Sequence, residues 1–281
     1  LLEQAATPLR IALAAPTGKA AARMQEAIRA GREALPMDAR IRGAIPAEAT
    51  TIHRLLGVRP GSAGFRYDRD TPLPVDVLVV DEASMVDLAL MAKLVRAVPR
   101  SARLILLGDK DQLASVEAGA VLGDIYGDSP GFSPDFRRRL FEATGQEPEG
   151  TGSAEDDAAE TPIRDAVVQL TRSYRFGEDS GIGRLSRLVN RGDGPGALDF
   201  LRGGACPDVV WRTLESTRHL AAGLAGIGET LGAYLAAGTP EAILNAFDRF
   251  RVLSPHRTGP CGVESLNALI AACLESRRAI H

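Results

Sequence analysis

The sequence of 281 residues contains few cysteines, few aromatic residues and no long apolar run, and these shortages exclude several classes of protein. Its three cysteines, Cys206, Cys261 and Cys273, are scattered and lack Cys-x-x-Cys spacing, which argues against a disulfide framework and a zinc site. No apolar stretch approaches the length that crosses a bilayer, and the opening LLEQAATPLR lacks the basic start and apolar core of a signal peptide. We therefore expect a cytoplasmic protein with no membrane partner.

The sequence also lacks a large excess of either charge, because its formal net charge is only -3. The chain as a whole therefore has no electrostatic preference for nucleic acid, although a local groove could still be basic. Apolar residues make up 45% of the chain, which is enough to bury a substantial core in one large or two ordinary domains.

Three short apolar runs alternate with segments of helical spacing. The runs are Arg10 to Ala15, Val75 to Val80 and Arg103 to Leu107, and the second is continuous, as in strands buried on both faces of a parallel sheet. We expect a helix after the first run that ends at Gly31, and one from Met85 to Val98 after the second. The alternation predicts an α/β fold with a doubly wound parallel sheet, in which ligands lie beyond the carboxyl ends of the strands.

Composition divides the chain into three expected parts. Residues 1–127 contain the predicted sheet, and residues 128–164 are rich in Pro, Gly, Ser and acidic residues, as expected for a flexible connector. One helix is expected in the connector, from Pro134 to Thr144, with an arginine run that could meet phosphate but more often forms a solvated face. Residues 165–281 should begin a second α/β domain. Its expected elements are order at Val167 to Leu170, helices near Gly183 to Arg191 and Ser216 to Ala236, and a strand at Phe250 to Leu253.

Two adjacent carboxylates, Asp81 and Glu82, follow the second apolar run. In nucleotide hydrolases, the first such acid holds Mg²⁺, usually through water, and the second orients or deprotonates the attacking water. The alternative is that Asp81 caps the following helix, where an acidic side chain is favoured. Asp-Glu pairs are common, so only their position at the end of a buried strand makes the two interpretations equally good.

Gln112 lies in the loop after the third apolar run and favours the catalytic interpretation. A neutral amide there could bind a γ-phosphate or the attacking water without adding negative charge. Without the carboxylates nearby, an exposed loop amide would be the better interpretation. The ends of neighbouring strands are therefore the predicted functional edge of the sheet.

Five blocks of sequence support this prediction, and they lie in one order along the first 195 residues. The blocks are APTGKAAARM (Ala15 to Met24), TIHRLLG (Thr51 to Gly57), VVDEASMVD (Val79 to Asp87), GDKDQLASVEAGAVLGD (Gly108 to Asp124) and LTRSYRF (Leu170 to Phe176). Together they resemble the superfamily 1 helicases, and within these the RecD type, the alpha subunit of exodeoxyribonuclease V. The stretch from Ser173 to Asp193 is more similar to this type than to conjugative relaxase-helicases or Pif1-like helicases.

The resemblance implies an ATP-hydrolysing DNA helicase with RecA-like domains, using ATP and Mg²⁺. It implies that Asp81 binds Mg²⁺, that Glu82 is the general base and that Gln112 couples the γ-phosphate to the DNA groove. Arg175 matches the arginine that reaches the γ-phosphate from the second domain, which would tie hydrolysis to domain closure. Tyr174 matches a residue that packs beside the nucleotide base, although a core tyrosine is nearly as good an interpretation.

The same resemblance places the blocks APTGKAA and TIHRLLG along a DNA groove. A helix start with free amides and a lysine suits a phosphate. The low aromatic content, 5%, limits how many bases can be stacked. Without the resemblance, His53 would be interpreted as a helix-start residue satisfied locally. The implied DNA-binding residues are Pro16, Thr17, Gly18, Lys19, Thr51 and His53.

The resemblance also implies a motor subunit that moves 5′ to 3′ on single-stranded DNA at double-stranded DNA ends, beside RecB-like and RecC-like subunits. The helicase part of a conjugative relaxase and a catalytically silent scaffold are the alternatives. The phosphate-binding loop G-x-x-x-x-G-K-[ST] does not occur in the sequence. We therefore expect an internal fragment that lacks this loop and does not hydrolyse ATP by itself.

Overall fold

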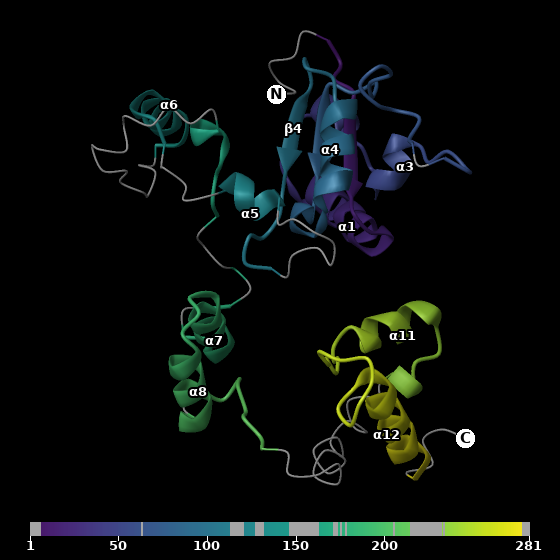
Figure 1. Cartoon of the computed structure of the whole chain (residues 1–281), viewed down its shortest axis with the longest axis vertical. Helices are drawn as coiled ribbons and strands as arrows, with labels where there is room; N and C mark the ends of the chain where they lie inside the picture. Colours follow the sequence, from purple (N-terminus) through teal and green to yellow (C-terminus); the bar gives the residue numbers. More distant parts are fainter. Residues whose placement is uncertain are drawn as a thin grey trace. The chain divides into compact units, whose positions relative to one another are not determined.

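The chain forms two compact units, Leu1–Arg172 and Ser173–His281, which are described here one at a time (Figure 1). The expected boundaries at residues 127 and 164 stay predictions, because most of the expected connector lies outside the described residues. The computed structural model describes residues 7–62, 64–112, 121–126, 132–145, 163–170, 174, 176–177, 179–204, 206–213, 232 and 234–276.

The first unit contains a four-stranded sheet in the order β2-β1-β3-β4, in which every neighbouring pair is parallel. Because parallel neighbours need crossover connections, helices lie between the strands along the chain. This confirms the predicted α/β class and a sheet of the RecA-like kind. The strands are β1 (Ile11–Ala15), β2 (Thr50–Thr51), β3 (Val77–Val80) and β4 (Arg103–Leu106).

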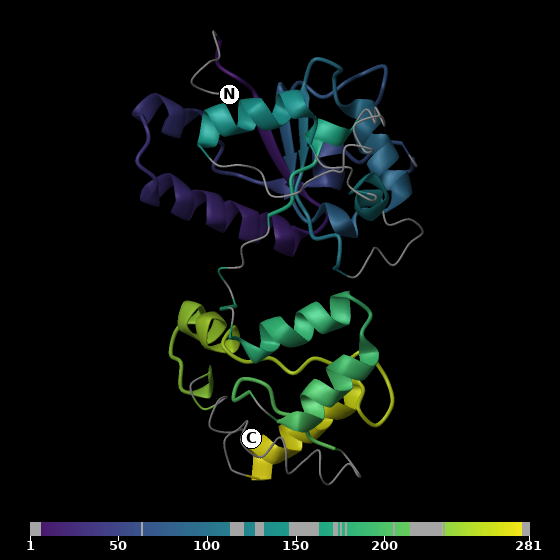
Figure 2. The same ribbon diagram turned by 90° about the vertical axis from the view of Figure 1, so that its left-hand side faces the viewer.

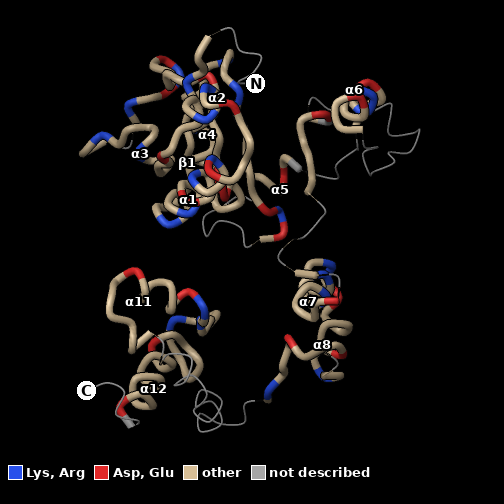
Figure 3. The backbone as a smooth tube through the Cα atoms, turned by 180° about the vertical axis from the view of Figure 1, so that it is seen from behind, with Lys and Arg blue, Asp and Glu red and all other residues tan. Residues whose placement is uncertain are grey.

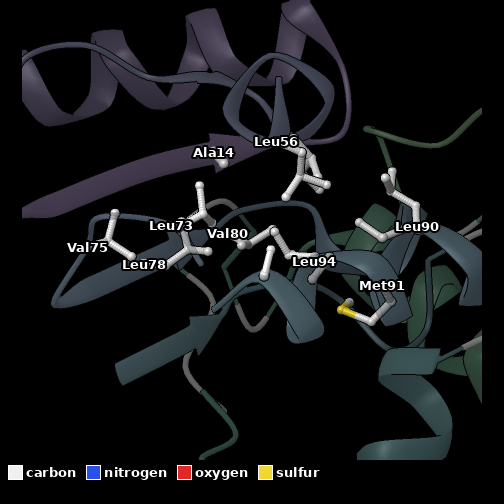
Figure 4. Close-up of a cluster of buried hydrophobic side chains, with 13 residues drawn as sticks. Ala14, Leu56, Leu73, Val75, Leu78, Val80, Leu90, Met91 and Leu94 are labelled. Carbon is white, nitrogen blue, oxygen red and sulfur yellow. The ribbon is translucent and has the colours of Figure 1, made fainter. Parts of the chain in front are cut away.

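Helices cover both faces of this sheet, with α1 (Gly18–Ala34) on one face and α4 (Leu88–Ala97) on the other (Figure 2). Successive side chains of a strand point to opposite faces, and β1 shows the consequence. Ala14 joins the core under α3 (Ile52–Leu56) and α4, whereas Ala15 packs with the start of α1. The larger core contains Leu78 and the α4 residues Met91 and Leu94 (Figure 4).

Two helical predictions need correction. The first helix does not end at Gly31, because Gly31 is not left-handed and α1 continues to Ala34. The expected helix from Met85 to Val98 is two elements, a 3-10 turn η1 (Ala83–Met85) and α4, separated where the Asp87 carboxylate accepts a hydrogen bond from the Leu90 amide at 2.8 Å. Met85, Leu88 and Val95 are exposed, and the buried face of α4 consists of Leu90, Met91, Leu94 and Ala97.

A charged pair fastens the amino ends of β1 and β3, at the opposite edge from the predicted site. The Arg10 guanidinium donates to both carboxylate oxygens of Asp76, at 3.0 and 2.8 Å, and the Arg10 amide donates to the same group at 2.8 Å. These hydrogen bonds lower the pKa of Asp76 to about 2. Both side chains contact solvent, so screening limits their contribution to stability.

The remaining described elements of the first unit are α2 (Ala39–Ala44), α5 (Val121–Tyr126), α6 (Pro134–Thr144) and η3 (Arg164–Ala166). The helix α6 has the predicted bounds, and Ser133 caps it while also donating through its hydroxyl to Asp165 at 2.6 Å. Its arginine run lies beside an acid (Figure 3), since Arg138 and Arg139 both pair with Asp135. That pairing favours the solvated-face interpretation.

The described part of the second unit is helical. The expected helix near Gly183 is confirmed as α7, but no strand forms at Phe250 to Leu253. The stretch from Val167 to Leu170, where order was expected, falls in the first unit, forms neither helix nor strand, and leaves Leu170 exposed. Most of the helix expected from Ser216 to Ala236 lies outside the described residues. No described helix has the length and apolar character that would span a bilayer. The helices are α7 (Gly181–Asn190), α8 (Gly194–Gly203), α11 (Pro240–Phe247) and α12 (Val263–Ser276).

Candidate functional site

The carboxyl ends of all four strands lie at one edge of the sheet, and the predicted residues of the first unit follow directly from them. Val80 pairs with Leu106 and with Ala14, while Ala15 pairs with Thr51. Neighbouring strands are separated by about 4.8 Å. The loops that begin at Asp81, at Pro16 and at Leu107 are therefore neighbours, as the sequence predicted.

Backbone hydrogen bonds hold the loop after β3 between those of its neighbours. The Asp81 amide donates to the Ala14 carbonyl at 2.9 Å, and the Ala83 amide donates to the Leu107 carbonyl at 2.8 Å. Asp81 caps neither following element, because η1 has no side-chain cap and Asp87 caps α4. The Oδ1 atom of Asp81 instead accepts from the Glu82 amide at 2.9 Å. The alternative that Asp81 is the cap of the following helix is therefore not supported.

Glu82 has a left-handed backbone, with φ 52° and ψ 39°. It is the one residue other than glycine with positive φ in the described part of the chain. This conformation crowds the Cβ against the following carbonyl and costs roughly 1 to 2 kcal/mol for a residue with a side chain. The turn sets the direction in which the carboxylate leaves the sheet edge, and such strain is typical of functional positions.

The loop after β4 begins with a close approach to η1. A Cβ added at Gly108 would lie 3.1 Å from the Ser84 nitrogen, 3.3 Å from the Ala83 nitrogen and 2.6 Å from Leu122 Cδ2. Only glycine therefore fits without movement where the loops after β3 and β4 meet. The helix α5, which carries Leu122, also packs against η1.

Ser84 is buried between these elements, with 7% of its surface exposed. Its Oγ is the one buried side-chain polar atom among the described residues that has no hydrogen-bond partner. Neither Ser84 nor Gly108 was predicted as a site residue. The glycine directly after an apolar strand was the available signal for Gly108, whereas burial of a serine is not visible in a sequence.

Gln112 is exposed at the end of the turn that follows β4. The backbone amide of Gln112 donates to the Asp109 carbonyl at 3.2 Å, and the Asp109 carboxylate accepts from the backbone amide of Asp111 at 3.0 Å. The turn therefore holds the backbone of Gln112 while its side chain faces solvent. Both the phosphate-binding and the loop-amide interpretation of Gln112 are compatible with this exposure.

At the start of α1, exposed residues surround a helix N-terminus. The Thr17 hydroxyl accepts from the Ala20 amide at 3.2 Å, so it is used as the helix cap. Gly18 and Lys19 are exposed, and a Cβ at Gly18 would meet no atom within 4 Å. Pro16, which precedes the cap, is partly buried. This helix start can approach an extended anion closely through its backbone, with Lys19 beside it.

Thr51 and His53 lie at the neighbouring helix start. The Thr51 hydroxyl caps α3 by accepting from the Arg54 amide at 3.2 Å. The His53 ring is exposed and packs edge-on against Phe65, with 5.8 Å between ring centroids. The ammonium of Lys93 lies 5.4 Å from the centroid of the same Phe65 ring. His53 therefore has a local packing role, and its predicted DNA contact is untested.

The second-unit residues of the predicted site follow from the block LTRSYRF. Tyr174 is 85% exposed, so the core-tyrosine interpretation does not hold. Arg175 lies outside the described residues. The helix α7 begins shortly after this block, and Asp208, which lies further along the chain, holds its start. The Asp208 carboxylate accepts from the Ile182 and Gly181 amides and from the Ser180 hydroxyl, and these hydrogen bonds lower the pKa of Asp208.

The donors at the sheet edge suit Mg²⁺ better than a metal held wholly by protein. No three His, Cys, Asp or Glu side chains gather as metal ligands in the described parts of the chain. Mg²⁺ commonly keeps several waters and binds through one or two carboxylates together with substrate phosphates. Asp81, a partly exposed carboxylate with one backbone donor, fits that mode of binding.

Comparison with known proteins finds the expected relatives. The family model described as an AAA domain matches residues 1–118. The RecBCD enzyme subunit RecD of Haemophilus influenzae is 38% identical over 96% of this chain and 45% of its own length. The same subunit of Mycobacterium tuberculosis is 43% identical over 94% of this chain and 40% of its own length.

A more distant relative is the ATP-dependent RecD2 DNA helicase of Deinococcus radiodurans, which is 36% identical over 69% of this chain and 24% of its own length. The resemblance that the sequence blocks indicated is thereby confirmed. The chain spans less than half the length of each of these relatives.

Proposed function

We propose that this chain, which is similar to RecD proteins over more than nine tenths of its length, is part of the ATP-driven motor of a DNA helicase subunit. The observation that supports the proposal is the strained turn at Glu82, which follows β3 at the carboxyl edge of a parallel sheet, where the neighbouring strand β4 leads into the Gln112 loop. Ligands of such sheets bind beyond that edge.

Within this proposal, ATP would supply the γ-phosphoryl group that is transferred to water, with ADP as the leaving group, and Mg²⁺ would neutralise the phosphate charge. Asp81 would hold the metal through water, in keeping with its partial exposure. Glu82 would orient and deprotonate the attacking water, and the left-handed turn would hold its carboxylate before the nucleotide binds. Gln112 would contact the γ-phosphate or that water and pass its state to the DNA groove.

Arg175 would complete the site from the second unit. A guanidinium presents a planar, permanent charge that stabilises the charge developing on phosphoryl oxygens. Tyr174, adjacent in sequence and exposed, would pack beside the nucleotide base. Because both residues follow the first unit in the chain, hydrolysis would depend on the approach of the two units.

The proposed DNA groove runs over the starts of α1 and α3. The hydroxyls of Thr17 and Thr51 already cap these helices, so the contacts to DNA phosphates would come from backbone amides and from Lys19. Pro16 and Gly18 keep bulky side chains away from this approach, and His53 would lie at its border. Backbone contacts of this kind give little sequence preference.

We further propose that the protein acts in a helicase–nuclease complex with RecB-like and RecC-like subunits, on single-stranded DNA exposed at double-stranded ends. Two of the relatives are named as subunits of the RecBCD enzyme, which supports this assembly. The RecD2 relative is named as a DNA helicase and not as a subunit, so the proposed assembly rests on the RecD relatives.

The test is Glu82→Gln in the full-length protein, with Glu26→Gln as the matched control on the exposed surface of α1. We expect Glu82→Gln to bind ATP with unchanged affinity and to lose at least about 99% of DNA-stimulated turnover, because general-base catalysis contributes roughly 100-fold or more. The control should retain both properties. Retained hydrolysis in Glu82→Gln would remove Glu82 from the proposed role, and absent hydrolysis in the unmodified protein would overturn the motor proposal itself.

A further inference from the structure

The buried hydroxyl of Ser84 is a departure from normal packing that the proposed chemistry does not use. Its Oγ has no hydrogen-bond partner among the described residues, and the residue is 93% buried. Buried polar groups in folded proteins are nearly always paired, because an unpaired one loses its bonds to water without replacement. An alanine at this position would fill nearly the same space without that loss, so the arrangement described here does not explain a serine.

Ser84 lies close to both segments that carry proposed catalytic residues, the turn at Glu82 and the loop that contains Gln112. It lies two residues after Glu82, in the 3-10 turn that the left-handed backbone of Glu82 begins. The loop that carries Gln112 starts against the same turn, where Gly108 approaches the Ser84 nitrogen. The helix after that loop returns to the turn, since α5 packs against η1. Ser84 is thus buried where the Glu82 turn and the Gln112 loop meet.

Backbone contacts among the described residues hold the two segments together at the base of the loop. The Ala83 amide donates to the Leu107 carbonyl at 2.8 Å, directly before Gly108. Beyond Gly108 the turn from Asp109 to Gln112 is exposed and bonded within itself. The turn carries polar groups, among them the Asp109 carboxylate and the Gln112 side chain, that would be candidates for a bond with the Ser84 hydroxyl if the turn shifted toward η1.

We propose that Ser84 is a positioning residue that couples Glu82 to Gln112. Its hydroxyl forms a hydrogen bond with the 109–112 turn when nucleotide draws that turn toward the sheet edge. The bond aligns Gln112 with the water that Glu82 activates. This inference rests on the proposed function and adds a residue and a regulated step to it.

The experiment compares Ser84→Ala and Ser84→Thr in the full-length protein, with Ser101→Ala as a surface control in the turn before β4. Melting temperature is measured without nucleotide. Single-stranded DNA affinity is measured with and without a non-hydrolysable ATP analogue, and their ratio is the coupling factor. DNA-stimulated turnover and the KM for ATP complete the set.

For Ser84→Ala we expect an equal or higher melting temperature, because an unpaired buried hydroxyl is removed. The coupling factor and kcat should each fall about threefold to tenfold, the equivalent of one neutral hydrogen bond, with the KM for ATP changed less than twofold. Ser84→Thr retains the hydroxyl but adds a buried methyl group, so it should lower the melting temperature while preserving the coupling. The surface control should match the unmodified protein in every measurement.

This crossed pattern distinguishes positioning from a structural role. If Ser84→Ala lowers the melting temperature together with kcat, or leaves the coupling factor unchanged, the inference is wrong. A raised KM with intact coupling would make Ser84 a direct nucleotide contact and would also overturn it. Failure of the proposed function has a different signature, since the unmodified protein would then show neither DNA-stimulated hydrolysis nor any effect of the analogue on DNA affinity.

Discussion

The left-handed backbone of Glu82 makes a prediction whose sign is opposite to the usual effect of glycine. At an ordinary position, glycine is less stable than alanine by roughly 0.5 to 1 kcal/mol, because the unfolded chain gains conformational freedom. With φ 52° and ψ 39°, residue 82 lies where a Cβ costs roughly 1 to 2 kcal/mol. Taking the difference, Glu82→Gly should be more stable than Glu82→Ala by about 0 to 1.5 kcal/mol, with a central value of about 0.8 kcal/mol.

The comparison of glycine with alanine isolates the backbone, because both variants remove the carboxylate and both lose the proposed base. Glu82→Gln serves as the third variant and should match the unmodified protein within about 0.5 kcal/mol, since it retains both the backbone strain and the side-chain volume. The three variants share every packing contact beyond residue 82.

Hydrogen exchange of the β3 amides is the suitable assay, because a chain of two units need not unfold in one step. The free energy of opening at Val77 to Val80 should rank glycine above alanine. A ranking with alanine above glycine would refute the strain at Glu82 and with it the argument that the turn orients the carboxylate in advance.

Three further predictions concern the fold that supports the site. Gly57→Ala should destabilise by about 1 to 3 kcal/mol more than Gly61→Ala in thermal unfolding, because both glycines have positive φ but only at Gly57 would the new Cβ meet another side chain, at 2.8 Å. The pKa of Asp76 is lowered from 3.8 to about 2, so its ion pair contributes stability that is complete above about pH 4 and is lost as pH falls through 2. The urea midpoint of Asp76→Asn should therefore vary less than that of the unmodified protein across this pH range. Leu78→Ala, at a residue with no exposed surface, should lower the free energy of opening of the β3 amides in hydrogen exchange by about 2 to 5 kcal/mol, and a loss below about 1 kcal/mol would contradict the described core.

Three of the four strands of the first unit could be predicted because their signal is local, whereas β2, which has only two residues, was not predicted. Each of β1, β3 and β4 is a short apolar run, and the structure places each within one or two residues of the expected bounds. The helix α6 was bounded correctly by its serine cap, its early proline and the glycine after it. Such features act through neighbouring residues, so a sequence contains them in full.

The failures arise where a local cap competes with an apolar pattern, or where an apolar run has no partner strand. The apolar spacing of Met85 and Leu88 matches a helix face, yet the hydrogen bond between Asp87 and the Leu90 amide starts α4 later, and both side chains are exposed. The apolar run at Phe250 to Leu253 has the pattern of a strand but pairs with no neighbour in the described residues. A strand needs a partner, and its own sequence does not provide one.

For the site, sequence reasoning identified residues but not how their groups are used. Asp81, Glu82 and Gln112 were placed at one sheet edge from their positions after strands, and the pairing of β3 with β4 agrees. Thr17 and Thr51 were expected to bind DNA at helix starts through the backbone, and the structure adds that both hydroxyls are used as helix caps. Capping is a local competitor for the same atoms, and only coordinates decide between the two uses.

Two unfavourable features therefore lie within three residues of each other, the strained backbone of Glu82 and the unpaired hydroxyl of Ser84. At the opposite edge of the sheet, by contrast, the polar groups of Arg10 and Asp76 are paired with each other. Departures from local rules that cluster in one place are expected where function, rather than stability, sets the requirement. The double variant that combines Glu82→Gly with Ser84→Ala should thus have a first unit more stable than that of the unmodified protein, as measured by hydrogen exchange of the β3 amides, and no turnover.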